Sequence, residues 1–166
     1  MHGEKMIRVN TADIGPDGLE VNGSEDPAFL ELDSAGGFPC RILDEVHYRL
    51  HASLAGRDLL VTGSAEVRIE TQCALCLKDI ALTLGSDKVC IFREKVPDEI
   101  VDITDDIREE ILLQVPERFK CSDDCRGLCP GCGADLNTEP CRCRKKRKKT
   151  DPDANHTWDA LDGLKL

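Results

Sequence analysis

The sequence predicts an α+β protein, with an antiparallel β-sheet body, one covering helix and a small C-terminal cysteine-rich module. Three observations lead to this prediction. Apolar and polar residues alternate over two long runs between residues 46 and 69, and an apolar stripe at helical spacing follows between residues 103 and 115. Beyond that stripe, six of the ten cysteines fall between residues 121 and 143.

The alternating runs predict a β-hairpin at the centre of the body. Successive side chains of a strand point to opposite faces, so a period of two indicates half-buried antiparallel strands. Residues 55–58, with sequence Ala-Gly-Arg-Asp, form the expected turn, and Gly85-Ser86 should break the following strand. The expected strands are residues 46–54, 61–69 and 80–84, with residues 88–92 extending the sheet.

A helix is predicted from Asp105 to Val115. We expect Thr104 to cap its N-terminus and Pro116 to end it. One face of this helix is apolar and should cover the sheet. The residues on that face are Ile103, Ile107, Ile111, Leu112 and Val115. The predicted domains are a body over residues 1–116, a module over 117–149 and a tail over 150–166.

Two explanations compete for the high cysteine content. Ten cysteines in 166 residues could form disulfides or bind metal, and the compartment decides between them. The polar stretch Met1–Met6 does not resemble a signal peptide, and no run approaches the ~20 apolar residues of a membrane helix. We therefore expect a cytoplasmic protein whose thiols are reduced unless they bind metal.

The cysteine-rich segment predicts a structural zinc site. Its centre, residues 129–133, reads Cys-Pro-Gly-Cys-Gly, a turn that lets both thiolates face one ion. Cys141 and Cys143 supply a second pair, and four thiolates are ligands that suit zinc. Few bulky apolar residues surround these cysteines, so the segment needs a metal to fold. Our preferred ligands are Cys129, Cys132, Cys141 and Cys143.

Other ligand sets stay open at this point. Cys121 and Cys125 are alternative ligands, the six thiolates could hold two ions, and an iron–sulfur cluster is the main alternative to zinc. The pair in Cys73-Ala74-Leu75-Cys76 either joins the distant cluster or is a reduced structural turn. We favour the structural turn, because a lone pair supplies half a site. Cys40 and Cys90 are expected to be buried as small apolar side chains.

A basic segment contrasts with the rest of the chain. It has seven basic residues in eight positions, and taking these seven from the 22 basic residues leaves 15 against 32 acidic ones, a net charge of −17 for the remainder. Such a segment is typical of phosphate-backbone binding, whereas the 4% aromatic content argues against a base-stacking platform. The predicted RNA-binding residues are Arg142, Arg144, Lys145, Lys146, Arg147, Lys148 and Lys149.

The sequence shows none of the motifs of a catalytic site. His47 and His51 fall on the polar side of a predicted strand, and neither a phosphate-binding glycine loop nor a nucleophile elbow is present. The acidic residues from Asp98 to Glu110 fit a solvated loop and a helix N-terminus. A zinc ion with four thiolates also leaves no open position for water. We expect a protein that is not an enzyme.

Several motifs together resemble those of the YceD family, the large ribosomal RNA subunit accumulation proteins. The resemblance covers about residues 40 to 166. The matching features are Cys73-Ala74-Leu75-Cys76-Leu77, the segment 102–116 with Glu109-Glu110-Ile111-Leu112-Leu113, the cysteine string from Cys121 to Asn137, the pair Cys141 and Cys143, Asp151-Pro152, and the closing stretch Leu161–Leu164. The Arg144–Lys149 run departs from the family's usual pattern, and some relatives lack the C-terminal cysteines.

The resemblance implies a bacterial or plastid-type factor that supports accumulation or processing of large-subunit ribosomal RNA. Its expected partner is that RNA or a pre-ribosomal particle, with no membrane and no small-molecule substrate. One alternative is an adaptor that binds a basic ribosomal protein through the acidic body. A redox-sensing zinc chaperone is a further alternative.

Overall fold

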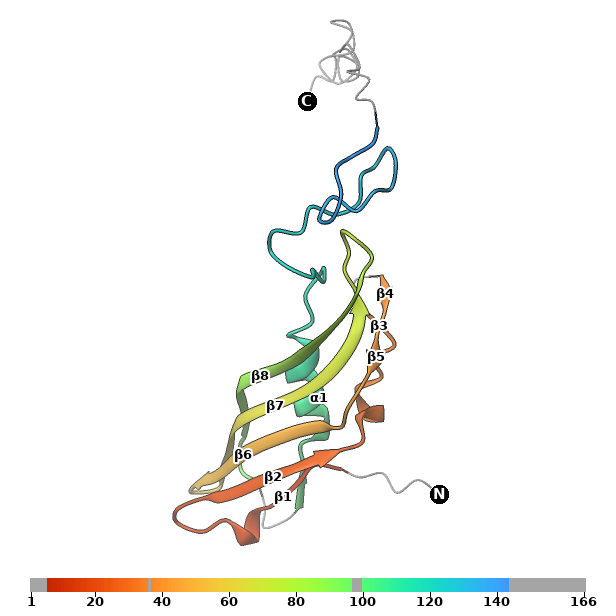
Figure 1. Cartoon of the computed structure of the whole chain (residues 1–166). Helices are drawn as coiled ribbons and strands as arrows, with labels where there is room; N and C mark the ends of the chain where they lie inside the picture. The colour runs from red at the N-terminus through yellow and green to blue at the C-terminus, as the bar shows by residue number, and fades with distance from the viewer. Residues whose placement is uncertain (1–5, 36, 97–99, 144–166) are drawn as a thin grey trace, which may run out of the picture.

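A computed structural model describes residues 6–35, 37–96 and 100–143 of the chain (Figure 1). Its centre is a five-stranded antiparallel sheet in which β7 pairs with β6 along one edge and with β8 along the other. β2 extends the sheet beyond β6, and the short β5 pairs with β7 past the end of β6. These strands are β2 (Leu19–Glu25), β5 (Arg41–Ile42), β6 (Val46–Ala55), β7 (Asp58–Gln72) and β8 (Asp79–Arg93).

The predicted hairpin is confirmed. β6 and β7 pair in register from His47–Glu66 to Ala55–Asp58, so Gly56 and Arg57 form a two-residue turn. The predicted break at Gly85-Ser86 is a β-bulge inside one long strand, because the register with β7 shifts between Gly63 and Ala65. A bulge increases the local twist and bends the strand.

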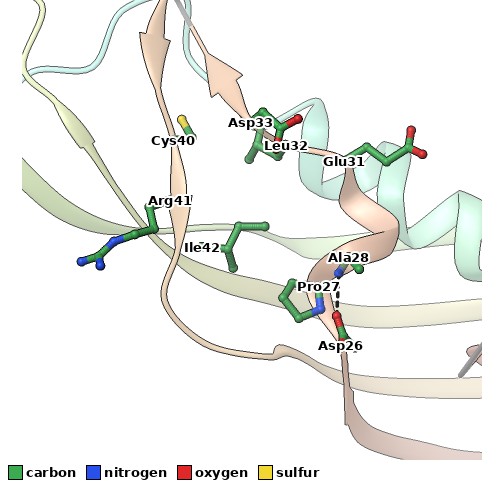
Figure 2. A pocket seen from close by; sticks show the side chains of 9 residues that line it. All are labelled: Asp26, Pro27, Ala28, Glu31, Leu32, Asp33, Cys40, Arg41 and Ile42. Carbon is green, nitrogen blue, oxygen red and sulfur yellow. Dashed lines mark hydrogen bonds between the residues drawn. The ribbon is translucent and has the colours of Figure 1, made fainter. Parts of the chain in front are cut away.

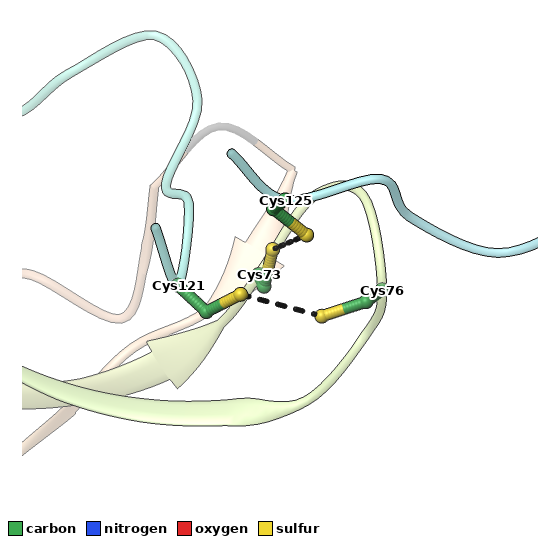
Figure 3. Close-up of side chains that lie close together, drawn as sticks. All are labelled: Cys73, Cys76, Cys121 and Cys125. Atoms are coloured by element: carbon green, nitrogen blue, oxygen red, sulfur yellow. Dashed lines mark hydrogen bonds between the residues drawn. The ribbon is translucent and has the colours of Figure 1, made fainter. Parts of the chain in front are cut away.

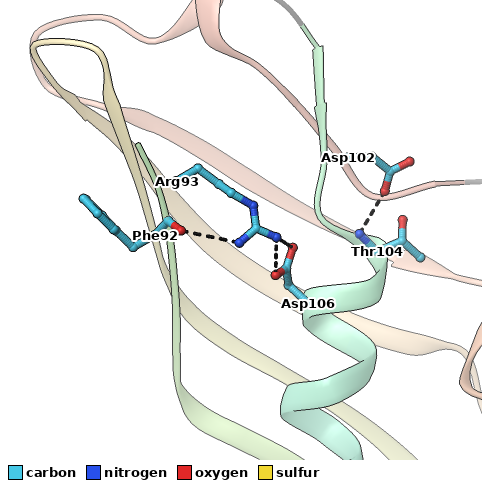
Figure 4. Close-up of polar contacts among 5 residues, drawn as sticks. All are labelled: Phe92, Arg93, Asp102, Thr104 and Asp106. Carbon is cyan, nitrogen blue, oxygen red and sulfur yellow. Dashed lines mark hydrogen bonds and ion pairs between the residues drawn. The ribbon is translucent and has the colours of Figure 1, made fainter. Parts of the chain in front are cut away.

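The one α-helix of the described residues, α1 (Thr104–Leu112), covers one face of the sheet (Figure 1). Ile103, Ile107 and Ile111 are fully buried and belong to the main apolar core. The apolar face was therefore predicted correctly. Arg93 at the end of β8 holds the helix N-terminus through two contacts with the Asp106 carboxylate, at 2.6 and 2.8 Å (Figure 4).

The predicted cap of this helix is wrong. Ile103 is the N-cap, and it makes no side-chain capping bond. Thr104 is instead the buried first residue of α1, and its hydroxyl accepts the N–H of Ile7 at 2.9 Å. The Asp102 carboxylate accepts the N–H of Thr104 at 2.9 Å (Figure 4). Thr104 therefore ties Ile7, the residue just before β1, to the helix, and the Asp102 carboxylate takes the capping role.

Short elements close the remaining edges of the body. β1 pairs with β9 and β3 with β4, in two small antiparallel ladders. Their bounds are β1 (Arg8–Asn10), β3 (Ser34–Ala35), β4 (Phe38–Pro39) and β9 (Ile100–Asp102), with 3-10 turns at η1 (Thr11–Asp13) and η2 (Pro27–Leu30). None of the helices in the described part of the chain is long and apolar enough to cross a membrane.

Candidate metal centres

The cysteine-rich segment lies at the end of the sheet where β7 turns into β8 (Figure 1). The chain leaves α1, buries Phe119 in the main core, and then meets this turn. The N–H of Ala74 donates to the carbonyl of Phe119 at 2.8 Å, and the N–H of Leu128 donates to that of Leu75 at 2.9 Å. Two backbone bonds thus hold the segment against the turn on either side of Cys121 and Cys125.

Four cysteines meet at this contact and form what we call the hairpin cluster: Cys73, Cys76, Cys121 and Cys125. Cys73 and Cys76 come from the β7–β8 turn and the other two from the C-terminal segment, and their sulfurs point toward one another (Figure 3). Sγ of Cys73 lies 3.8 Å from that of Cys125, and Sγ of Cys76 lies 3.7 Å from that of Cys121. All four sulfurs lie within 4.8 Å of one another, so the cluster could hold a metal ion.

A second group, the C-terminal cluster, consists of Cys129, Cys132, Cys141 and Cys143. The shorter sulfur–sulfur distances within it run from 3.2 Å between Cys129 and Cys141 to 3.9 Å between Cys132 and Cys141. Gly131 fits against this group, because a Cβ there would lie 2.7 Å from Sγ of Cys143. The structure therefore brings together the four preferred ligands, as a second site that could hold a metal ion.

The donor sets suit a metal that prefers thiolate ligands. A tetrahedral ion with sulfur ligands at about 2.3 Å has sulfurs about 3.8 Å apart along each edge. The sulfur–sulfur distances of 3.8 and 3.7 Å in the hairpin cluster agree with that edge. In the C-terminal cluster the Cys132–Cys141 distance of 3.9 Å agrees with it, whereas the three distances among Cys129, Cys141 and Cys143 are shorter, at 3.2–3.3 Å. Soft thiolates in a closed tetrahedron favour zinc or iron–sulfur over magnesium or calcium. The four thiols of each cluster thus suit a tetrathiolate ion, with distances already at the tetrahedral edge in the hairpin cluster.

Each cluster combines thiols whose pKa is lowered with thiols whose pKa is raised. Burial acts to raise the pKa of Cys73, but the N–H groups of Cys76, Leu75 and Cys121 outweigh it and lower that pKa to about 6. The N–H of Lys78 acts to lower the pKa of Cys76, but desolvation and the neighbouring thiols raise it to about 12. A bound divalent cation removes this conflict, because it stabilises all the coordinating thiolates together.

The same division appears in the C-terminal cluster. The N–H groups of Ala134 and Arg142 lower the pKa of Cys132 to about 6, and the N–H of Gly131 lowers the pKa of Cys129. The sulfurs of Cys141 and Cys129 raise the pKa of Cys143 instead. The four thiols therefore cannot all ionise near neutral pH without a nearby positive charge.

The structure corrects two expectations about the other cysteines. Cys73 and Cys76 are not a lone pair as expected, since Cys121 and Cys125 complete a set of four thiols with them. The signal in the sequence was the even number of paired cysteines, eight in four pairs, which supplies two tetrahedral sets. Cys90 is exposed on the open face of the sheet, not buried, whereas Cys40 packs half-buried against the core.

The basic segment falls almost entirely outside the described residues. Arg144, Lys145, Lys146, Arg147, Lys148 and Lys149 all lie outside them, as does the predicted tail over residues 150–166. Arg142 is described, and its guanidinium contacts the Glu139 carboxylate at 2.7 Å. The root of the segment thus lies between two cysteines of the C-terminal cluster.

A surface groove beside η2 gathers polar side chains but uses them locally (Figure 2). The Asp26 carboxylate accepts the N–H of Ala28 at 2.9 Å and so begins the 3-10 turn. Arg41 contacts the Glu70 carboxylate at 2.7 Å, away from the groove's acidic residues. These contacts account for Asp26 and Arg41 as structural residues.

Fold and site together define a class: an antiparallel β-sheet protein with two all-cysteine centres that could hold metal ions. Residues 91–165 match the model of a protein family described as large ribosomal RNA subunit accumulation protein YceD. The predicted resemblance to the YceD family is therefore confirmed. The matched range begins in β8 and includes α1 and the six C-terminal cysteines.

The chain is also similar to individual proteins, one of which carries the family's name. Uncharacterized proteins of Mycobacterium tuberculosis and Mycobacterium bovis are each 29% identical over 138 residues, which covers 74% of this chain and 59% of theirs. The chain thus spans about three-fifths of the length of these relatives. The maize protein named large ribosomal RNA subunit accumulation protein YCED homolog 1, chloroplastic, is 40% identical over 50 residues, covering 30% of this chain and 17% of its own. No solved structure matches the chain.

Proposed function

We propose that this protein is a non-enzymatic ribosome-assembly factor that supports the accumulation or processing of large-subunit ribosomal RNA. The observation that carries the proposal is the YceD match over residues 91–165. That range holds the helix and the cysteine-rich segment, so the part of the chain shared with the family includes a candidate metal centre. The maize relative carries the same role in its name.

The C-terminal cluster would support this role by holding the start of the basic segment in place. We assign it a structural zinc ion, because four thiolates fill a tetrahedral shell and leave no position for a reacting water. Cys141 and Cys143 flank Arg142, so a zinc ion bound there would fix the root of the basic segment. Basic residues on a fixed root contact phosphates without reading sequence. The rest of the chain has a net charge of −17 and repels nucleic acid, so RNA would bind at the basic segment.

Depletion of the protein in the cells that produce it tests the proposed role. Large-subunit ribosomal RNA should fall relative to small-subunit RNA, and its precursors should accumulate. A complementing copy with Cys129→Ser and Cys132→Ser should restore the ratio less well than a copy with Cys40→Ser and Cys90→Ser, cysteines outside both clusters. An unchanged ratio of the two RNAs after depletion contradicts the proposal.

RNA binding by the basic segment is tested separately. Glutamine at Lys145, Lys146, Lys148 and Lys149 should weaken binding to ribosomal RNA and lower the slope of log K against log salt by roughly 3. A matched control replaces four exposed lysines of the described chain, Lys78, Lys88, Lys95 and Lys120, and should leave the slope unchanged. Equal effects of both variants would show that general charge, not the segment, drives binding.

A second candidate rests on the charge of the rest of the chain. Without the basic segment the net charge is −17, which suits a basic ribosomal protein as partner. Pull-downs before and after ribonuclease treatment separate the two proposals. A basic ribosomal protein that stays bound after RNA digestion favours the adaptor.

A further inference from the structure

The turn between β7 and β8 has the same backbone pattern as the Cys-Pro-Gly-Cys turn of the C-terminal cluster. In the C-terminal turn, the N–H of Gly133 donates to the carbonyl of Cys129, and the N–H of Cys129 donates to that of Ala134, both at 2.8 Å. In the sheet turn, Leu77 donates to Cys73 and Cys73 donates to Lys78, both at 2.9 Å. The two turns thus make the same pair of bonds at the same spacing.

The contacts to sulfur repeat as well. The first thiol of each turn faces the N–H groups two and three residues later, Leu75 and Cys76 for Cys73. The equivalent groups for Cys129 are those of Gly131 and Cys132. A cysteine turn whose amides point at its own sulfur is preformed for a thiolate bound to metal.

The residue after the second cysteine is left-handed in both turns. Gly133 has φ 72° and Leu77 has φ 59°. Glycine adopts this region freely, but a leucine does so at a cost. Half of the Leu77 surface is exposed, so burial of its side chain does not offset that cost. The backbone of the sheet turn is therefore held by something other than the packing of Leu77.

A second pair of thiols closes the site from another part of the chain. Cys121 and Cys125 follow Cys76 by at least 45 residues, yet their sulfurs lie 3.7 and 3.8 Å from those of Cys76 and Cys73. Gly127 allows this approach, because a Cβ there would lie 2.9 Å from the Leu75 carbonyl oxygen.

A small apolar core explains the cluster less well. Leu75 and Leu128 are the partly buried apolar residues that pack on it within the described chain. Cys121 is exposed, and an exposed thiol adds little to an apolar core. Its sulfur nevertheless faces Cys76 at the spacing that a tetrahedral ion requires.

We propose that the hairpin cluster is a second structural zinc site, independent of the C-terminal cluster, and that its ion fastens the C-terminal segment to the β-sheet. The ion joins the β7–β8 turn to residues 121–125, where the described structure otherwise offers backbone bonds and two leucines. This proposal does not rest on the role in ribosome assembly, and failure of either leaves the other intact.

Thiol labelling of the full-length protein, purified with its metal, tests the site without any substitution. Cys121 and Cys90 are both exposed, but Cys90 lies in neither cluster. N-ethylmaleimide followed by peptide mass mapping should label Cys90 at once and spare Cys121. A zinc chelator should then abolish the protection of Cys121. Labelling of Cys121 as fast as Cys90 before chelation would overturn the proposal, even if zinc fills the C-terminal cluster.

Paired substitutions assign the ion to its ligands. Cys73→Ser with Cys76→Ser should remove about one zinc per chain, and Cys121→Ser with Cys125→Ser should remove the same one. The control variant with Cys40→Ser and Cys90→Ser should keep the full content. Wild-type zinc content in both cluster variants contradicts the proposal. If a cluster variant does not fold, the labelling of the wild-type protein decides.

Discussion

Leu77 and Gly133 occupy equivalent positions in the two cysteine turns but at different energetic cost. Both are left-handed, at φ 59° and 72°. For a residue with a side chain this conformation costs roughly 1–2 kcal/mol. The cost falls at a candidate metal turn, which is where backbone strain is commonly retained.

Replacement of Leu77 by glycine should therefore stabilise the metal-loaded protein. Relief of the left-handed leucine outweighs the greater freedom that glycine gives the unfolded chain, and we expect a gain of about 0.5–1 kcal/mol in the free energy of unfolding. Denaturant unfolding measures it. Leu43, another partly exposed leucine without positive φ, provides the control, and its replacement by glycine should destabilise. A comparable loss at both positions would refute the argument from backbone strain.

Asn137 contacts the hairpin cluster through its side-chain amide. Its Nδ2 donates to Sγ of Cys125 at 3.5 Å, and its Oδ1 accepts the N–H of Arg126 at 2.8 Å. The Asp135 carboxylate holds the same amide at 2.7 Å. In the sequence Asn137 lies between the two cysteine pairs of the C-terminal cluster, yet its side chain contacts a sulfur of the hairpin cluster.

Asn137→Asp should weaken zinc binding at the hairpin cluster. The change replaces an N–H donor by a carboxylate beside a thiolate, and loss of such outer partners typically costs about 10–100-fold in metal affinity. Competition with a coloured chelator measures the affinity. Asn22→Asp adds the same charge at an exposed position on β2 and should change nothing. Equal zinc affinities for the two variants would show that Asn137 does not contribute to metal binding at the hairpin cluster.

At the scale of elements, the contact between the β7–β8 turn and the C-terminal segment is short. Besides the four thiols it consists of the bonds from Ala74 to Phe119 and from Leu128 to Leu75 and a few apolar contacts. Such a contact opens readily unless a crosslink closes it. A metal ion at the hairpin cluster would close a loop of about 45 residues, between Cys76 and Cys121.

Removal of that ion should expose the segment to protease. With Cys73→Ser and Cys76→Ser, or with a chelator, trypsin should cut faster after Lys120 and Arg126, which are exposed and flank the two ligands. Mass spectrometry of the fragments follows both sites. Cleavage after Arg57, in the β6–β7 turn, should not change and serves as the internal control. Unaltered cleavage at Lys120 and Arg126 would mean that the ion does not hold the segment.

At the scale of the whole molecule, local patterns were predictable and long-range contacts were not. The β6–β7 hairpin followed from alternation, because pattern and partner lie next to each other in the chain. β2 was not predicted, since Gly23 interrupts its pattern. A Cβ at Gly23 would lie 2.7 Å from the Tyr48 hydroxyl oxygen, so a larger residue there would require the Tyr48 ring to move. The partner of the Cys73 turn was missed for a related reason, as it lies 52 residues further on and no local pattern reports it.

The helix and the cysteine clusters show the same contrast between contacts close in the sequence, which were predicted, and distant ones, which were not. Ile103, Ile107 and Ile111 were assigned to the buried face correctly, because a helix sets that spacing by itself. The role of Thr104 depends on Ile7, 97 residues away, and was therefore missed. The C-terminal cluster was assembled from near neighbours and was predicted, whereas the hairpin cluster needed the sheet to bring its halves together.

The central claim is that two tetrathiolate zinc centres order the C-terminal segment, one within it and one between it and the sheet. Native mass spectrometry of the full-length protein tests this most directly, because it counts ions on the folded chain. We expect about two zinc ions per chain, and about one after either Cys73→Ser with Cys76→Ser or Cys129→Ser with Cys132→Ser. A single ion that survives the first pair of substitutions and disappears with the second would contradict it.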